Sequence, residues 1–387
     1  MKLKKIFLFT IIFFTAATFI FAQEDFIRGF DASYVLQVEK NGGIYKTSSG
    51  KEEDLFKILK DSGINLIRLR LWNTDESLED MISLAQRAKS YGLKFMLDFH
   101  YSPTWADYGT QIVPREWENF TLLEQLSDAV FNYTDCVLKK LRDLNIQVDY
   151  VQIGNEIDNG LLLKKADGSP YLLSCKRKSQ NINSVLSAAS QAVRKNFSDC
   201  KIVIHLASMQ WLDWVEDFFD PLVKKVDFDV LAFSYYPFYD QGTLAVIEKN
   251  IKALKKHYKK DVLIAETSYA WTLDYADDNM SNLFYTKQEE ISAEHLVYSN
   301  KKLSKSFNTK KRNGITYIEA SKENQSQLLQ ELIKICQNAG SIGLCYWGGE
   351  WISAGNFASN WENQALFDFE GNALPALNVL GSYMTNF

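Results

Sequence analysis

The stretch Tyr150–Gly160 reads YVQIGNEIDNG. Tyr150–Ile153 has the composition of a buried β-strand, and Gly154, Asn155 and Glu156 follow it directly. Gly and Asn are ordinary turn residues at the end of a strand. Taken alone, GNE therefore fits a simple turn as well as it fits a strand that delivers a carboxylate, and the rest of the chain has to distinguish the two interpretations.

Strand-like and helix-like segments alternate on both sides of this stretch. The strand-like segments are 26–34, 64–72, 93–101, 147–156, 201–208, 228–237, 260–269 and 342–351. The helix-like segments carry apolar residues three and four positions apart, and they span roughly 52–63, 78–91, 122–144, 182–196, 211–223, 244–258, 322–339 and 375–383. Strands that alternate with helices predict a parallel sheet of the α/β class. Eight such units predict a closed (β/α)8 TIM barrel.

The barrel prediction indicates where catalytic residues should be sought. Catalytic residues of such barrels lie at the C-terminal ends of the strands and on the loops that follow. His100, Glu156, Tyr235, Glu266 and Trp347 all lie at or just beyond predicted strand ends. We expect a single catalytic domain over residues 23–387, with long loops after the fourth strand (157–179) and the seventh strand (269–319). The second loop is rich in Lys, Ser and Asn, and it is either a solvated excursion or a wall over a cleft.

The N-terminus has the pattern of an export signal. MKLKK is followed by the apolar run IFLFTIIFFTAATFIFA and then by the polar residues QED. This order predicts a signal peptide over residues 1–22, cleaved after Ala22, and hence a secreted or periplasmic protein. The apolar run is long for a signal peptide, so an uncleaved anchor is the alternative.

Composition and charge exclude several classes of partner. The chain has 387 residues, 46% hydrophobic and 24% charged, which is ordinary for a globular protein. The net charge of −5 gives no basic field for nucleic acid or for an anionic membrane. Aromatic residues are abundant, with 9 Trp, 19 Tyr and 25 Phe, and those outside the core would suit the flat apolar faces of sugar rings.

The five cysteines, Cys136, Cys175, Cys200, Cys336 and Cys345, show no C-x-x-C spacing. Zinc and dithiol redox motifs are therefore absent from the sequence. Export would permit disulfides, but the odd count leaves at least one thiol unpaired within the chain, and buried free thiols are the simpler interpretation.

Two glutamates stand at the ends of the predicted fourth and seventh strands: Glu156 in GNE and Glu266 in AETSY. These strand ends face each other across the mouth of a closed barrel. Two facing carboxylates are the minimum apparatus for glycoside hydrolysis, in which one donates a proton to the leaving oxygen and the other attacks the anomeric carbon or activates water. Different environments must hold their pKa values apart. The sequence therefore predicts a glycosidase site.

Several neighbours have chemistry that suits this site. Asn155 can donate to the sugar hydroxyl beside the anomeric carbon. Arg68 and Arg70 alternate along the second strand, and one of them facing inward could hold the nucleophile ionised; the alternative is a buried ion pair with Asp98 or another barrel acid. No cofactor is required for such chemistry.

Other candidates come from the loops. His100 and Trp105 lie in DFHYSPTWADYG and together suit a sugar platform with a hydroxyl donor. Tyr235 in SYYPFYD has a hydroxyl that could bond the nucleophile, and the alternative interpretation of Tyr235 and Tyr236 is that they only pack. His205, in the fifth strand, faces either the mouth or the packing.

With these residues collected, the chain resembles the endo-β-1,4-galactanases of glycoside hydrolase family 53, within the clan of retaining (β/α)8 hydrolases. The matching stretches include FIRGFDASY, DLFKILKDSGINLIRLRLW, MLDFHYSPTWAD, VQIGNEIDNGLL, FSYYPF, IAETSYAWT, YWGGEW and NQALFDFEGNALPAL, which span about Phe26 to Leu377. The resemblance implies that Glu156 is the acid/base and Glu266 the nucleophile. It also implies that the sugar is surrounded by Arg68, His100, Trp105, Asn155, Tyr235 and Trp347.

The resemblance also implies the substrate and an ion. The substrate would be an internal stretch of β-1,4-galactan, the side chain of pectin, bound by a protein that we expect to be a monomer. Some bacterial members hold calcium in the long seventh loop, and LDYADDNMSN offers a set of hard oxygen ligands here, in Asp274, Asp277, Asp278 and Asn279.

Two departures from the family pattern lie beside the cleft. Where members usually read HxSDTWADP, this chain has Pro103 and Tyr108, and where they usually read YWEPAW it has Gly348, Gly349 and Glu350. The glutamate pair is intact, so the departures affect the expected substrate more than the chemistry. A retaining glycosidase for mannan, xylan or β-glucan, and a glycan-binding barrel without activity, remain the alternatives.

Overall fold

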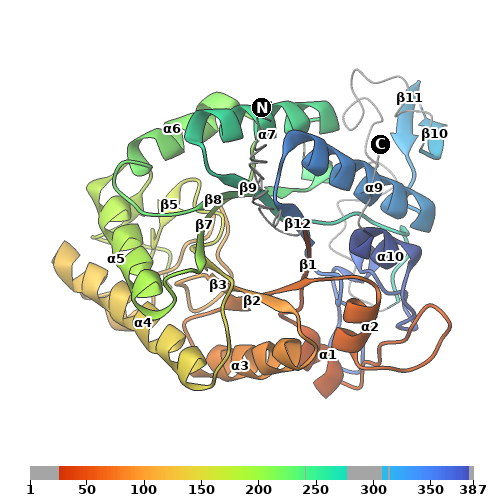
Figure 1. Ribbon diagram of the computed structural model, residues 1–387, viewed down its shortest axis with the longest axis horizontal. Helices are drawn as coiled ribbons and strands as arrows, with labels where there is room; N and C mark the ends of the chain where they lie inside the picture. The colour runs from red at the N-terminus through yellow and green to blue at the C-terminus, as the bar shows by residue number, and fades with distance from the viewer. Residues whose placement is uncertain (1–25, 240, 277–306, 313, 383–387) are drawn as a thin grey trace, which may run out of the picture.

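The computed structural model describes residues 26–239, 241–276, 307–312 and 314–382. Eight parallel strands close into a barrel, in the order β1-β12-β9-β8-β7-β4-β3-β2 (Figure 1). Their bounds are β1 Ile27–Asp31, β2 Leu66–Leu71, β3 Lys94–Phe99, β4 Tyr150–Ile153, β7 Lys201–Leu206, β8 Val230–Tyr235, β9 Asp261–Thr267 and β12 Gly343–Tyr346. Each strand lies within a segment that the sequence predicted, so the (β/α)8 barrel is confirmed.

Helices surround the barrel as an outer ring (Figure 1). The principal ones are α2 Leu55–Asp61, α3 Asp75–Ser90, α4 Leu123–Asp143, α5 Gln180–Asn196, α6 Leu212–Leu222, α7 Leu244–Tyr258, α9 Lys322–Ala339 and α10 Pro375–Gly381. Side chains of Asp54, Ser179, Thr243 and Ser321 accept hydrogen bonds from backbone N–H groups in the first turns of α2, α5, α7 and α9. These caps explain why each helix begins close to its predicted position.

The core has two layers. Inside the barrel, side chains from all eight strands fill the axis, among them Leu66, Met96 and Leu263. The second and larger layer lies between the outer faces of the strands and the helices. Because side chains alternate between these layers along each strand, position in a strand determines which residues can reach the mouth of the barrel.

Short elements that the sequence did not predict occupy the loops. They are α1 Val35–Lys40, the hairpins β5 Gly160–Leu161 with β6 Cys175–Lys176 and β10 Thr309–Arg312 with β11 Ile315–Ile318, and the 3₁₀ turns at Arg115–Trp117, Pro237–Tyr239 and Glu362–Gln364. The first hairpin belongs to the long loop after β4. That loop packs on the loop after β3, where the backbone N–H groups of Leu163 and Lys164 donate to Gln111 O.

All five cysteines are free. Four are buried, as expected, but Cys136 is exposed on α4, where its position in the helical pattern falls outside the apolar face. None of the helices in the described ranges has both the length and the apolarity needed to cross a membrane.

Candidate active site

A cleft of about 810 Å³ opens at the C-terminal ends of the barrel strands. Glu156 and Glu266 both line it. The aromatic lining comes from several different loops and comprises Trp105, Tyr108, Trp211, Trp214, Tyr236, Tyr239, Trp347, Trp351 and Trp361. The structure thus brings the two predicted carboxylates to one groove that is rich in sugar-sized aromatic faces.

A tight turn after β4 projects Glu156 into the cleft. Gly154 has φ +101° and Glu156 has φ +46°, a left-handed conformation that costs a non-glycine residue about 1–3 kcal/mol. Hydrogen bonds on both sides hold the turn, from Gly154 N to Phe99 O and from Ile157 N to His205 O. GNE is therefore a turn as well as a carboxylate site, and the two interpretations of the sequence are combined.

An irregularity in β9 directs Glu266 into the same cleft. Phe233 pairs with Ile264, but Ser234 pairs with Glu266, so β9 contains one extra residue relative to β8. Ala265 already faces the barrel axis, and the bulge allows the next side chain to face the mouth as well. The Glu266 carboxylate then forms an ion pair with Arg68 Nη2 at 2.9 Å and accepts a hydrogen bond from the Tyr236 hydroxyl at 2.8 Å.

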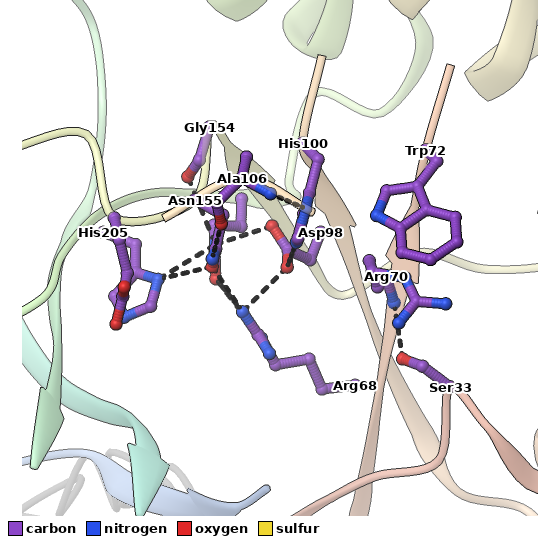
Figure 2. Close-up of polar contacts among 12 residues, drawn as sticks. Ser33, Arg68, Arg70, Trp72, Asp98, His100, Ala106, Gly154, Asn155 and His205 are labelled. Carbon is purple, nitrogen blue, oxygen red and sulfur yellow. Dashed lines mark hydrogen bonds and ion pairs between the residues drawn. The ribbon is translucent and has the colours of Figure 1, made fainter. Parts of the chain in front are cut away.

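Arg68 is the central cation beneath the cleft, with a side chain only 1% exposed. Besides Glu266, its guanidinium contacts Asp31 and Asp98, each at 2.8 Å, and Asn155 Oδ1 at 3.0 Å. Figure 2 shows it pointing toward Asp98 and Asn155. Arg68 therefore forms the ion pair with Asp98 that was the alternative, and it also contacts Glu266, the carboxylate that it was predicted to support.

Arg70 has a different role. Its guanidinium lies over the rings of Trp72, Tyr34 and Trp105, at 3.8, 4.7 and 4.6 Å from their centroids; Figure 2 shows Trp72 beside it. Of these three rings Trp105 lines the cleft, so the cation–π contacts of Arg70 hold Trp105 in place.

The two carboxylates differ in their electrostatic surroundings. Burial, followed by the charge of Glu266, raises the pKa of Glu156 well above its usual range. Burial also raises the pKa of Glu266, but only to about 7, because Arg68 and the Tyr236 hydroxyl oppose the shift. Glu266 is thus the group that ionises first and Glu156 the one that keeps its proton, which is the division of roles that a retaining mechanism needs.

His100 and Asn155 support the site from below. Ala106 N donates to His100 Nδ1 at 3.2 Å, so the other ring nitrogen, at 3.1 Å from Asp98 Oδ2, carries the hydrogen. Burial lowers the pKa of His100, which keeps the ring neutral. Asn155 Nδ2 donates to Ala106 O at 2.8 Å. Both side chains therefore hold the loop that carries Trp105, and His100, 2% exposed, does so without lining the cleft.

The prediction for Tyr235 is wrong. Its side chain is fully buried outside the barrel mouth, and its hydroxyl donates to Gly242 O at 3.2 Å. Tyr236 instead donates to Glu266, the predicted nucleophile. The reason is strand alternation: Val230 and Ala232 face the barrel axis, so Ser234 and Tyr236 share that face and Tyr235 points to the helices.

This pair of tyrosines supplies a matched test. Tyr236→Phe removes a donor to an ionised carboxylate, which should raise the pKa of Glu266 and cost about 10–100-fold in kcat. Because Glu266 must be ionised to attack, the acidic limb of kcat/KM should move up by about one pH unit. Tyr235→Phe should destabilise the fold by about 1 kcal/mol and leave that limb in place. Equal pH profiles for the two purified variants would contradict the assignment.

Both departures from the family pattern have visible structural consequences. A Cβ at Gly348 would lie 2.4 Å from Trp361 Cδ1, and one at Gly349 would lie 2.5 Å from Phe30. Gly348 therefore makes room for Trp361 to enter the cleft wall, and Gly349 makes room for the ring of Phe30. Glu350 is fully buried and accepts from Tyr34 N, and burial, followed by the charge of Asp31, raises its pKa well above the usual range.

On the other side of the cleft, Pro103 is half-buried and Tyr108 is 61% exposed. Tyr108 thus adds an aromatic face to the cleft edge.

The predicted calcium ligands are only partly within the described structure. Asp274 is exposed, and its Oδ2 lies 3.4 Å from the Thr272 hydroxyl. Asp277, Asp278 and Asn279 lie outside the described residues. Within the described ranges, His, Cys, Asp and Glu side chains form no group of three or more that could hold a metal ion.

Several residues of the site escaped the sequence analysis. Tyr34, Trp351 and Trp361 come from loops whose path has no local signal, and they form one aromatic cluster with Trp105 and Trp347. Trp347 and Trp361 meet edge to face at 4.9 Å between ring centroids. Ser234, whose hydroxyl oxygen lies 2.6 Å from Glu156 Oε1, could have been found from the alternation along β8.

Comparison with known proteins shows the family of the chain. The sequence profile described as Glycosyl hydrolase family 53 matches residues 27–302 and 285–380. The chain is 32% identical to an uncharacterised protein of Niallia circulans (94% of this chain and 96% of the relative), and 30% identical to an arabinogalactan endo-β-1,4-galactanase of Cellvibrio japonicus (91% and 89%). A solved GH53 catalytic domain of Ignisphaera aggregans superposes with a TM-score of 0.78 at 35% identity, covering 92% of this chain and 95% of that one.

Proposed function

The chain belongs to glycosyl hydrolase family 53, and from this we propose that it is a retaining endo-β-1,4-galactanase that cuts internal bonds in the galactan side chains of pectin. One observation carries the proposal: the cleft presents two carboxylates in unlike environments, with Glu266 held by Arg68 and Tyr236. The galactan assignment is supported by the names of relatives such as that of Cellvibrio japonicus.

The mechanism follows from the two environments. Glu156 donates its proton to the glycosidic oxygen while Glu266 attacks the anomeric carbon, which breaks the C–O bond and forms a galactosyl-enzyme ester. Glu156, now a carboxylate, takes a proton from water as the water oxygen attacks the same carbon. The ester bond breaks, Glu266 leaves as a carboxylate, and the product keeps the β configuration.

The shape of the cleft supports cleavage within a chain. Beyond Glu156 the groove continues to the start of α6, where Trp211 is 68% and Trp214 is 46% exposed. The Arg177 guanidinium lies 3.8 Å from the centroid of the Trp214 ring and holds it in place. Because Glu156 protonates the leaving side, this end of the groove would bind sugars on the leaving side of the cut bond, with rings stacked on the two tryptophans.

Three further properties are part of the proposal. Residues 1–22 would direct export, so the enzyme would act outside the cytoplasm as a monomer. A calcium ion would be bound by Asp274 together with Asp277, Asp278 and Asn279. None of the chemical steps depends on such an ion.

A panel of polysaccharides tests the substrate assignment. Purified residues 23–387, incubated with β-1,4-galactan, mannan, xylan and mixed β-glucan, should release reducing ends from galactan alone and lower its viscosity early, as internal cuts do. Hydrolysis of another glycan in place of galactan would overturn the substrate but keep the glycosidase. Galactan binding without hydrolysis of any glycan would show a non-catalytic barrel.

A further inference from the structure

A chain of buried polar groups runs from the acid/base carboxylate into the barrel. Ser234 Oγ lies 2.6 Å from Glu156 Oε1 and 3.1 Å from His205 Nε2. The other ring nitrogen, His205 Nδ1, lies 2.8 Å from Asn155 Oδ1. Ser234 and His205 are 1% and 0% exposed, so solvent does not serve these groups. The proposed catalytic cycle gives neither residue a task.

The surroundings determine which nitrogen of His205 carries hydrogen. Asn155 Nδ2 donates to Ala106 O and its Oδ1 accepts from Arg68, so the amide orientation is fixed. An oxygen that accepts must be met by a donor, so His205 Nδ1 carries the hydrogen. Gln152 Nε2 also lies 3.2 Å from this nitrogen, but its two hydrogens have closer acceptors in Asp98 Oδ1 at 2.6 Å and Asn155 Oδ1 at 3.0 Å. Figure 2 shows His205 directed at Asn155.

His205 Nε2 is therefore a bare acceptor. Burial, followed by the charge of Arg68, lowers the pKa of His205 well below its usual range, so the ring stays neutral. The single hydroxyl hydrogen of Ser234 then has two competing acceptors, His205 Nε2 and Glu156 Oε1. If Glu156 is protonated, it donates to Ser234 Oγ and the serine donates to His205, and each of these groups has a partner. If Glu156 is ionised, the serine must turn to it and His205 Nε2 loses its donor.

We propose that Ser234 and His205 are positioning residues that favour the acid form of Glu156: His205 draws the serine hydroxyl toward itself and so makes Ser234 an acceptor for the acid proton. This inference rests on the proposed role of Glu156. During the cycle the hydroxyl turns toward Glu156 when its proton has gone to the leaving oxygen, and it turns back when Glu156 is protonated by water. His205 keeps one hydrogen throughout, so no proton is lost along the chain.

Other charged groups also act on this chain. Glu266, Asp158 and Asp107 face Glu156, and Tyr236 and Tyr239 lie near it. Arg68, Asp98 and His100 face His205. All of these groups stay in place when only Ser234 or His205 is changed. A comparison of variants at these two positions therefore separates the effect of the Glu156–Ser234–His205 hydrogen bonds from the effect of the surrounding charges.

A double-mutant cycle tests the relay through the pH profile. His205→Leu should free Ser234 to donate to the Glu156 carboxylate, which stabilises the ionised form. The alkaline limb of kcat/KM, where the acid is lost, should move down by about half to one pH unit. In a Ser234→Ala background the same His205→Leu change should leave the limb where Ser234→Ala alone puts it. A shift of equal size in both backgrounds would show a change in hydration or packing and would overturn the proposal.

A second measurement uses the unaltered chain and needs no substrate. In protein labelled with ¹⁵N and ¹³C, the NMR spectrum of His205 should show a hydrogen on Nδ1 and none on Nε2. The chemical shift of Nε2 should change at the pH where the ¹³C carboxyl signal of Glu156 titrates. The Glu156 signal is assigned with Glu156→Gln. A hydrogen on Nε2, or an Nε2 chemical shift that does not change as Glu156 titrates, would overturn the proposal. A failure to cut galactan would instead refute only the proposed function, since both signals remain readable.

Discussion

Glu266→Gln should lower kcat on β-1,4-galactan by about 10⁴-fold or more, because the amide cannot form the ester on which double displacement depends. The fold should survive: the amide oxygen can still accept from Arg68 and Tyr236, and the side chain keeps its size. Initial rates with purified protein, together with a thermal unfolding curve, measure the two effects separately. Glu350→Gln is the matched control, since it alters a buried carboxyl that does not line the cleft and should change kcat by no more than a few-fold.

Azide separates the roles of the two glutamates. In Glu266→Ala, azide can fill the space of the missing carboxylate and attack an activated aryl β-galactoside from that side, which yields the α-azide. In Glu156→Ala, Glu266 still forms the ester, and azide then displaces it to give the β-azide. The reverse pattern of products would exchange the two assignments. Near-normal activity in either alanine variant would refute the glutamate pair altogether.

Arg68→Met should destabilise the protein by about 3–5 kcal/mol, since it removes the cation from a buried cluster that keeps its carboxylates. Arg68 contacts Asp31, Asp98 and Glu266 within 3 Å, and together with His100 it outweighs the effect of burial to lower the pKa of Asp98. Without Arg68 the pKa of Asp98 loses its main lowering influence and rises, and the pKa of Glu266, which burial already raises to about 7, rises further. The loss of stability is therefore largest at high pH and shrinks as the pH falls and the carboxylates are protonated. Urea unfolding at two pH values measures the effect.

Arg70→Met controls for the loss of any buried arginine from β2. Arg70 contacts aromatic rings, and the loss of these contacts should cost about 0.5–2 kcal/mol with little change between the two pH values. If Arg68→Met were no more harmful than Arg70→Met, or if its cost did not grow with pH, Arg68 would not be the counter-ion that this account requires.

The barrel and the positions of the two glutamates could be predicted because both depend on local sequence patterns. Each strand is a short apolar run, and each helix has its own periodicity and cap. Once the strands close into a barrel, the C-terminal end of every strand lies at the same mouth. The positions of Glu156 and Glu266 at the mouth of the barrel could be predicted from these strand ends alone. Arg68 was predictable for the same reason, although its three acidic partners come from β1, β3 and β9 and only the closed barrel brings them together.

The errors and omissions have physical causes. The end of a strand does not by itself show which of two adjacent tyrosines faces the mouth, and the alternation that Val230 and Ala232 establish places Tyr236 there and not Tyr235. The bulge that directs Glu266 into the cleft leaves no mark in the sequence, since it depends on pairing between two strands. Trp361 enters the cleft wall only because Gly348, distant in sequence, has no side chain.

The most direct test of the central claim is the anomeric configuration of the first product. Proton NMR of purified enzyme acting on β-1,4-galactan should show the new reducing end appearing as the β anomer, with the α anomer rising later by mutarotation. Initial formation of the α anomer would contradict the double displacement through Glu266.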